Sequence, residues 1–145
     1  MFLGEFEHSL DSKGRLVLPR KFRDALEASG CVLTKGQESC LYVFSMEQWE
    51  EEVARLRRLP RTDRRNRKYT RSFFASALDQ TLDKQGRIQI PERHREFAGL
   101  GKDVTVVGAM DRIEIWSTGA WAAEAAEADE YYSGIEEVLS EDGGI

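Results

Sequence analysis

A ten-residue stretch occurs twice in this chain and constrains its fold more than any other feature. The first copy, Leu10–Pro19, reads LDSKGRLVLP, and the second, Leu82–Pro91, reads LDKQGRIQIP, at an offset of 72 residues (82 − 10 and 91 − 19). The same offset, without a gap, pairs residues outside the stretch: Arg23 with Arg95, Val32 with Val104, Gly36 with Gly108, Ser45 with Ser117 and Trp49 with Trp121. The chain therefore contains a duplicated folding unit, although two copies are too few for a solenoid.

Each copy has the pattern of a tight turn between two strands. Asp11 and Asp83 can accept hydrogen bonds from the backbone two residues on, and the glycine three positions later tolerates a positive φ. The apolar residues that alternate after the arginine predict a strand with one buried face. Pro19 and Pro91 end that strand and suit the first turn of a helix. The unit is expected to be strand, turn, strand and short helix.

The patterning predicts further elements in both copies. In the first, strands are expected at residues 2–10, 15–18, 31–35 and 41–44, with a short helix ending near residue 30 and a helix capped by Ser45. In the second, strands are expected at 77–82, 87–90, 104–107 and 112–116, with a helix after Pro91 and an acidic one from Ser117. We divide the chain into a first half (1–54), a basic helical linker (55–74), a second half with a C-terminal helix (75–132) and an acidic, flexible tail (133–145).

Composition favours a cytoplasmic protein without a cofactor. No apolar run approaches the roughly 18 residues that a membrane span needs, and the N-terminus lacks an export signal. Cys31 and Cys40 have no ligand-like neighbours and are expected to be reduced core residues. His8 and His94 are isolated as well, so neither a metal site nor a catalytic role is assigned to them.

Charge is distributed unevenly along the chain, which the net charge of −5 does not reveal. Residues 55–71 carry 9 positive and 1 negative groups, whereas residues 121–145 carry 0 and 8. Pro60 should break this basic stretch, with Thr62 or Asp63 capping a second helix that runs to about Phe74. The basic stretch is open to two interpretations: a second DNA surface, or a linker helix whose charge meets an acidic neighbour such as the C-terminal segment.

Two copies of one unit can complete each other's sheet across an approximate twofold axis. Such an intramolecular pseudo-dimer would place Arg15 and Arg87 side by side on one edge. A twofold-related pair of this kind is the arrangement that many DNA-reading proteins use, here supplied by a single chain.

The double Asp-x-x-Gly-Arg motif, in a chain of this length that begins Met-Phe-Leu-Gly, resembles the MraZ family. The resemblance extends from Met1 to about Trp121 and implies a mixed α/β fold of two tandem swapped-hairpin units, similar to AbrB and SpoVT transcription factors, that assemble into a homo-oligomeric ring. It further implies a bacterial regulator that binds double-stranded DNA at short direct repeats upstream of the division and cell-wall operon. Repression is the expected output, because a ring across a promoter would occlude it.

The resemblance also implies which residues contact DNA. The family's motif arginines correspond to Arg15 and Arg87, and the expected DNA-binding residues are those of the two turns: Ser12, Lys13, Gly14, Arg15, Lys84, Gln85, Gly86 and Arg87. Asp11, Asp83, Pro19 and Pro91 are expected to be structural. An arginine at the tip of a β-ribbon can bind guanine O6 and N7, while a lysine beside it suits phosphate.

Less specific interpretations stand beside these. Each motif aspartate could pair with the arginine of its own turn; we favour a structural role for the aspartates and DNA contact for the arginines, since an exposed pair adds only about 0–1 kcal/mol. Trp49, Trp116, Trp121 and Phe44 are expected in the core or a subunit interface rather than as base-stacking platforms. No residue pattern indicates an enzyme or a small-molecule substrate. The alternative function is a non-enzymatic ring that serves as a nucleoid or protein-interaction scaffold.

Overall fold

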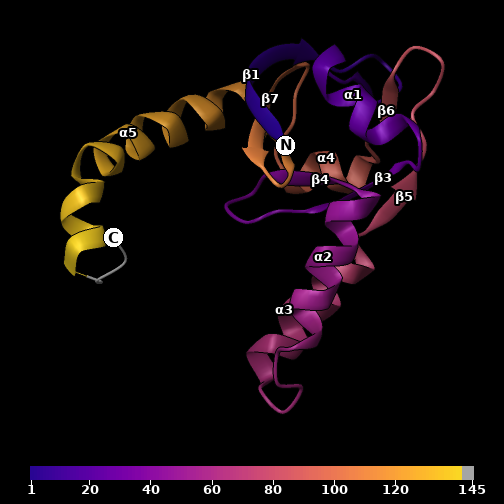
Figure 1. Ribbon diagram of the computed structural model, residues 1–145. Coiled ribbons are helices and arrows are strands. Elements are labelled where there is room, and N and C mark those ends of the chain that lie inside the picture. The colour runs from indigo at the N-terminus through magenta and orange to yellow at the C-terminus, as the bar shows by residue number, and fades with distance from the viewer. Residues whose placement is uncertain (142–145) are drawn as a thin grey trace.

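Both halves of the chain contribute strands to one antiparallel sheet. A computed structural model describes the backbone of residues 1–141, with side chains through Ile135, and contains a six-stranded sheet and a separate two-stranded ribbon (Figure 1). The mixed α/β class expected from the sequence is confirmed.

The elements up to Ala75 follow the expected order: β1 (Phe2–Ser9), β2 (Arg15–Val17), α1 (Arg20–Glu27), β3 (Cys31–Lys35), β4 (Leu41–Ser45), α2 (Met46–Arg57) and, in the linker region, α3 (Arg64–Ala75). Both predicted helix caps are present. The Ser45 hydroxyl accepts a hydrogen bond from the Gln48 backbone N–H at 3.2 Å, and Asp63, rather than Thr62, caps α3 by accepting from Arg65 N–H at 2.8 Å.

The second half repeats the order from β1 to α2 with different lengths: β5 (Leu78–Gln80), β6 (Arg87–Gln89), α4 (Glu92–Phe97), β7 (Asp103–Met110), β8 (Ile113–Ser117) and α5 (Thr118–Glu141). β7 is longer than predicted, because its whole length pairs with β1, from Ser9 opposite Asp103 to Phe2 opposite Met110. That pairing joins segments about 100 residues apart in the sequence, which local patterning does not reveal.

The strand order reflects the duplication. The sheet runs β1-β7-β8-β4-β3-β5, and the offset of 72 converts β3 into β7 (103 − 31) and β4 into β8 (113 − 41). β5 lies within the segment equivalent to β1. Exchanging the equivalent strands therefore reverses the order onto itself, which is the pattern that an approximate twofold axis between the halves produces.

The strand registers agree with this pattern. In the ribbon, Leu16 pairs with Ile88, its own equivalent (88 − 16 = 72). At the centre of the sheet, Leu41 pairs with Ile115 and Val43 with Ile113, so that each pair is the counterpart of the other under the offset. The two halves thus meet along both the ribbon and the sheet, and neither half completes the sheet alone.

Two apolar clusters hold the body together. The first lies beneath the ribbon and includes Leu16, Leu18, Ile88 and Ile90, each at most 1% exposed. The second is aromatic and forms where α2 and α3 meet the sheet; it contains Phe44, Trp49, Phe73, Trp116 and Trp121. Phe44 and Trp116 are buried in this cluster and Trp49 and Trp121 are partly buried against it, which agrees with the expected position in the core or a subunit interface.

Two helical arms project from this body (Figure 1). α2 and α3 form a hairpin that extends to one side, and α5 extends to another, well away from the hairpin. α5 continues through Ser133 to Glu141, so up to that residue the expected tail is part of the helix. Residues 142–145, where the rest of that expectation falls, lie outside the described residues.

The cysteines, possible metal clusters and possible membrane-spanning helices were also considered in the sequence. Cys31 and Cys40 are free and buried, as predicted, and burial raises the pKa of their thiols to about 11 and about 12. Among the side chains that the structure describes, those of residues 1–135, no group of three or more His, Cys, Asp or Glu could hold a metal ion. In the same part of the chain, every helix is too short or too polar to cross a membrane.

Candidate nucleic-acid interface

The first motif forms the expected turn. The Asp11 carboxylate accepts hydrogen bonds from the backbone N–H of Lys13 at 2.9 Å and of Arg15 at 2.8 Å. Gly14 has a φ of +75°, a backbone conformation that residues other than glycine rarely adopt. The turn closes through Gly14 N–H, which donates to the Asp11 carbonyl at 3.1 Å. The Asp11 side chain thus satisfies two backbone N–H groups within the turn.

The second turn has the same geometry. The Asp83 carboxylate accepts from the backbone N–H of Gln85 and of Arg87, both at 2.9 Å, and Gly86 again has a φ of +75°. The halves also bind each other at these turns. Leu18 N–H donates to the Gly86 carbonyl at 3.1 Å. Its counterpart, Ile90 N–H, donates to the Gly14 carbonyl at 2.9 Å.

Each motif arginine pairs with the aspartate of its own turn. Arg15 Nε lies 2.7 Å from Asp11 Oδ2, and Arg87 Nε lies 2.7 Å from Asp83 Oδ2. Arg87 Nη1 also lies 3.9 Å from Asp11 Oδ2, which links the turns of the two halves. The arginine side chains are 31% and 22% exposed, so they are less free in solvent than a turn position suggests. The hydrogen bond of each arginine to the aspartate of its own turn uses Nε and not the terminal nitrogens that make bidentate contacts with guanine.

The ribbon places both arginines on one face. Leu16 and Ile88 point into the core, and because side chains alternate along a strand, their neighbours lie on the opposite face. Arg15 is opposite Gln89, and Arg87 is opposite Val17. The outer face of this two-stranded ribbon therefore carries two arginines related by the duplication.

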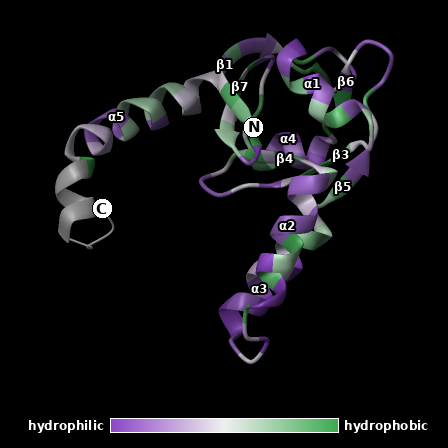
Figure 2. Ribbon diagram, viewed as in Figure 1, coloured by the Kyte–Doolittle hydropathy of each residue, from purple (hydrophilic) through white to green (hydrophobic). Residues whose placement is uncertain are grey.

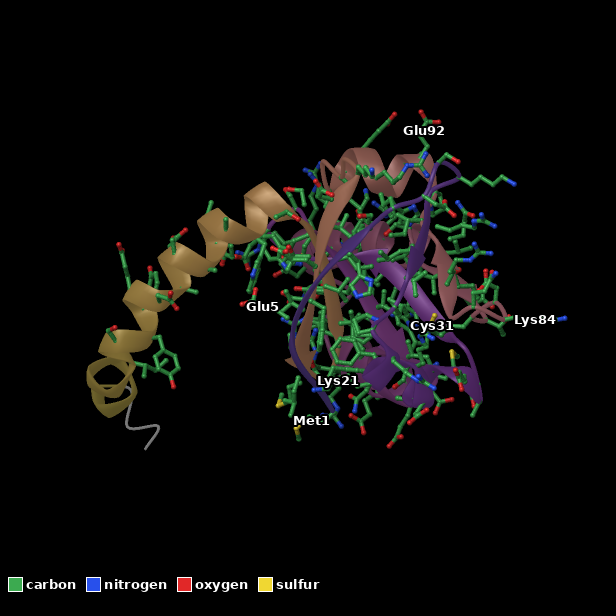
Figure 3. All side chains as sticks on the ribbon, turned by 90° about the horizontal axis from the view of Figure 1, so that it is seen from above. Met1, Glu5, Lys21, Cys31, Lys84 and Glu92 are labelled. Atoms are coloured by element: carbon green, nitrogen blue, oxygen red, sulfur yellow. The ribbon has the colours of Figure 1, made fainter. Side chains whose placement is uncertain are left out.

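The remaining turn residues lie around this face. Ser12, Lys13, Lys84 and Gln85 are exposed, whereas Gly14 and Gly86 are buried. Figure 3 shows the Lys84 side chain extending away from the body at the end of its turn. The two turns thus lie at the two ends of the antiparallel ribbon, with exposed Lys13 and Lys84 in the turns and Arg15 and Arg87 on the ribbon between them.

Arg23 and Arg95, which the repeat offset pairs and to which the sequence analysis assigned no role, pack against the turns. Arg23 Nε donates to the Leu18 carbonyl at 2.9 Å, and Arg95 Nη1 donates to the Ile90 carbonyl at 2.6 Å. A Cβ at Gly86 would lie 2.5 Å from Arg23 Nε, and one at Gly14 would press on the Arg95 guanidinium. Glycine is therefore required at both positions to leave room for an arginine side chain as well as to adopt a positive φ. The offset of 72 residues between Arg23 and Arg95 (95 − 23) is the sequence signal that could have identified this pair of arginines.

A glutamine pair was also missed. Gln80 receives the Gln89 backbone N–H on Oε1 at 2.8 Å and donates from Nε2 to the Gln89 carbonyl at 3.0 Å. Gln89 Nε2 then donates to the Lys13 carbonyl at 2.7 Å, which ties the second half to the first turn. No repeat signal marks these residues, because their counterparts, His8 and Val17, differ in chemistry.

Hydrogen bonding lowers the pKa of both motif aspartates. The backbone N–H of Arg15 has the largest effect on the pKa of Asp11, followed among the lowering contacts by the Arg15 side chain; Arg87 acts likewise on the pKa of Asp83. A carboxyl group whose pKa is lowered by folding stabilises the folded state. This stabilisation is complete at a pH above the pKa of the group in the unfolded chain, and it is lost as the pH falls through the pKa of the group in the folded protein.

We therefore expect the turns to keep their ion pairs from neutral pH down to about pH 5 and to lose them only in stronger acid. Carboxyl carbon NMR against pH should show Asp11 and Asp83 titrating below an aspartate in an unfolded peptide. Asp11→Asn is the matched control, because it removes one of the two shifted resonances. Titration of either group at or above the ordinary value would mean that the turn pairs do not persist in solution.

The comparisons with known proteins agree with the duplication. A family model described as "MraZ protein, putative antitoxin-like" matches residues 1–72 and again residues 73–137. The chain belongs to the MraZ family. The two matched segments begin 72 residues apart (73 − 1), which is the offset of the repeated turn. The MraZ resemblance noted from the turns is thereby confirmed, and it extends past Trp121.

Similar relatives span nearly the whole chain. Proteins named "Transcriptional regulator MraZ" include one from Salinispora tropica, 50% identical over 94% of this chain and 96% of its own length. The relative from Acetivibrio thermocellus is 45% identical over 97% of this chain and 92% of its own. That from Micrococcus luteus is 46% identical over 94% and 95%. Each of these alignments covers at least 94% of this chain.

Proposed function

We propose that this chain is a sequence-specific, DNA-binding transcriptional regulator that reads short direct repeats through its two arginine-bearing turns. The relatives that carry the name of a transcriptional regulator support the general function. The observation that carries the specific proposal is the placement of Arg15 and Arg87 on the outer face of one ribbon.

A two-stranded ribbon fits the major groove of B-form DNA, where base edges present distinct hydrogen-bonding patterns. Because Asp11 and Asp83 hold the arginines by Nε, the terminal nitrogens remain for guanine O6 and N7. Lys13 and Lys84, at the turn tips, are suited to the flanking phosphates, which fix position without reading sequence.

The proposal includes the assembly. The first half (1–54) and the second (75–132), joined by the linker at 55–74, would form an intramolecular pseudo-dimer of swapped-hairpin type. Copies of it would assemble into a ring. Each ribbon offers few cationic groups, so one chain should bind weakly. A ring that engages successive repeats would raise the affinity through effective concentration if repeat spacing matches subunit spacing.

The proposed output is repression of the division and cell-wall operon by a cytoplasmic, nucleoid-associated protein. The alternative remains a ring-forming scaffold that binds the nucleoid without sequence preference or binds other proteins. Sequence preference and salt dependence separate these possibilities, because phosphate contacts release counterions whereas contacts with proteins need not.

Fluorescence anisotropy with a duplex of spaced direct repeats from the chain's own upstream region, beside a scrambled duplex, tests the proposal at two salt concentrations. We expect tight binding to the repeats only, with log affinity falling against log salt by about 0.9 for each phosphate contact. Equal binding to both duplexes would indicate a nonspecific nucleoid protein. Binding to neither would favour the protein scaffold.

A further inference from the structure

The helix α5 lacks the covering that its counterpart α2 has. On α2, the Trp49 ring stacks on Phe73 of α3 with centroids 5.5 Å apart, and Leu56 is only 4% exposed. The offset of 72 converts this stripe of Trp49, Val53 and Leu56 into Trp121, Ala125 and Ala128 on α5. In the part of the chain that the structure describes, α3 has no counterpart after α5.

The α5 stripe continues beyond the body. Trp121 is anchored, since its indole N–H donates to the Glu5 carboxylate and its ring lies 5.6 Å from Trp116. Figure 3 shows Glu5 near the base of α5. Farther along, Tyr132 and Ile135 continue the same spacing of three and four residues, and they are 79% and 44% exposed. An apolar stripe therefore faces solvent on the projecting part of the helix.

The hairpin of α2 and α3 carries a groove of complementary character. The groove has a volume of about 510 Å³, and its apolar lining residues are Val53, Leu56, Leu59, Pro60 and Phe74. Four arginines line it as well: Arg57, Arg61, Arg67 and Arg71. Such a site suits an amphipathic helix with an apolar stripe and acidic flanks.

The charges of the two arms are opposite. The stretch 55–71, which supplies much of the groove, has 9 basic groups and 1 acidic, and residues 121–145 have 0 and 8. Figure 2 shows the end of the hairpin as strongly hydrophilic, while the described part of α5 is paler over most of its length. In Figure 1 the arms extend in different directions, so α5 lies away from the groove of its own chain.

We infer that the stripe of α5, from Ala125 to Ile135, docks into the α2–α3 groove of a second copy of this chain. The contact is heterologous, because one copy supplies the helix and the other the groove. Repetition of such a contact closes a ring or continues as a filament. This inference rests on the assembly proposed above and names the surfaces that would build it.

The apolar lining of the groove favours a helix over DNA as its occupant. Phosphates require cations but no apolar lining, whereas an amphipathic helix with acidic flanks would contact both the apolar side chains and the arginines of the groove. The basic stretch is therefore assigned to a contact between copies, and a DNA surface becomes an outcome of the test.

Size-exclusion chromatography with light scattering tests each surface separately. The helix variant combines Tyr132→Asp with Ile135→Asp, and its control combines Ala126→Asp with Ser133→Asp, which adds the same charge away from the stripe. We expect the helix variant to fall to the single-chain mass of 16.6 kDa while the control keeps the wild-type assembly. All four positions lie on the projecting helix, so the body should fold normally in both variants.

The groove variant combines Arg57→Glu with Arg71→Glu. Its control combines Arg64→Glu with Lys68→Glu, an equal charge change at exposed positions outside the groove. Only the groove variant should become a single chain. Equal masses for variant and control, on either arm, would overturn the inference.

Mixing the two variants distinguishes a heterologous contact from other contacts. The helix variant keeps an intact groove and the groove variant keeps an intact α5, so an equimolar mixture can form one functional contact but not two. We expect a complex of twice the single-chain mass and nothing larger. A mixture that stays at the single-chain mass would contradict the inference. Such a result is expected if the α5 helices of two copies pair with each other, because the mixture contains intact α5 helices on only one of the two variants.

The DNA and assembly proposals can fail separately. Both single-chain variants retain the turns and should keep their preference for a one-repeat duplex over a scrambled one. A groove variant that keeps the wild-type mass but loses DNA affinity would make the groove a DNA surface and overturn the docking inference. A wild type that assembles as described without preferring the repeats would instead overturn only the regulator proposal.

Discussion

Replacing both Arg15 and Arg87 with alanine should abolish the preference for direct-repeat DNA while leaving the assembly intact. A bidentate arginine–guanine contact is worth about 1–3 kcal/mol, so each single substitution should lower the affinity for the repeats about 5- to 150-fold. Affinity for a scrambled duplex should change little, because phosphate contacts from the turn tips persist. Anisotropy with both duplexes measures the difference.

Lys13→Ala is the informative control for this experiment. Lys13 is exposed at the tip of the first turn, and removing a phosphate contact should weaken binding to both duplexes equally and reduce the salt slope by about 1. Light scattering on the arginine variants checks the competing explanation. Since each arginine pairs with its motif aspartate, smaller assemblies in these variants would assign the arginines a structural role.

Leu16→Ala should destabilise the whole protein, and not the first half alone. Leu16 is fully buried and pairs with Ile88 across the ribbon, so its truncation leaves a cavity between the halves. Such substitutions cost about 2–5 kcal/mol. Because the halves share the ribbon and the sheet, denaturant unfolding should remain a single transition at a lower midpoint.

Val17→Ala is the matched control for Leu16→Ala. Val17 is the next residue in β2 but lies on the outer, partly exposed face of the ribbon, so its truncation should cost roughly 1 kcal/mol or less. Two separate transitions in Leu16→Ala, with only the first weakened, would show that the halves fold independently and would contradict the shared core.

The duplicated motif made much of this fold predictable. Asp, Gly and Pro have strong local preferences, so the turns, the strands beside them and the helices after Pro19 and Pro91 follow from a few residues. Ser45 and Asp63 likewise cap their helices by local hydrogen bonds. Local chemistry is what a single sequence shows best.

The remaining features depend on residues far apart in the chain. The pairing of β1 with β7 joins residues about 100 positions apart, and no local pattern encodes that register. The Arg–Asp pairing could be stated as an alternative, but the engagement of Nε, rather than a terminal nitrogen, is a matter of three-dimensional geometry. The contacts of Arg23, Arg95 and Gln89 with the opposite half were hidden for the same reason.

A thermodynamic cycle between protein and DNA tests the central claim most directly. In a repeat duplex with 7-deazaguanine at one guanine at a time, the N7 acceptor is lost while base pairing is kept, and the affinities of wild type and of Arg15→Ala are measured for each. Direct reading predicts at least one guanine whose replacement weakens the wild type but has no further effect on the variant. Additive losses at every guanine, for Arg15→Ala and for Arg87→Ala alike, would contradict the proposal that these arginines read the bases.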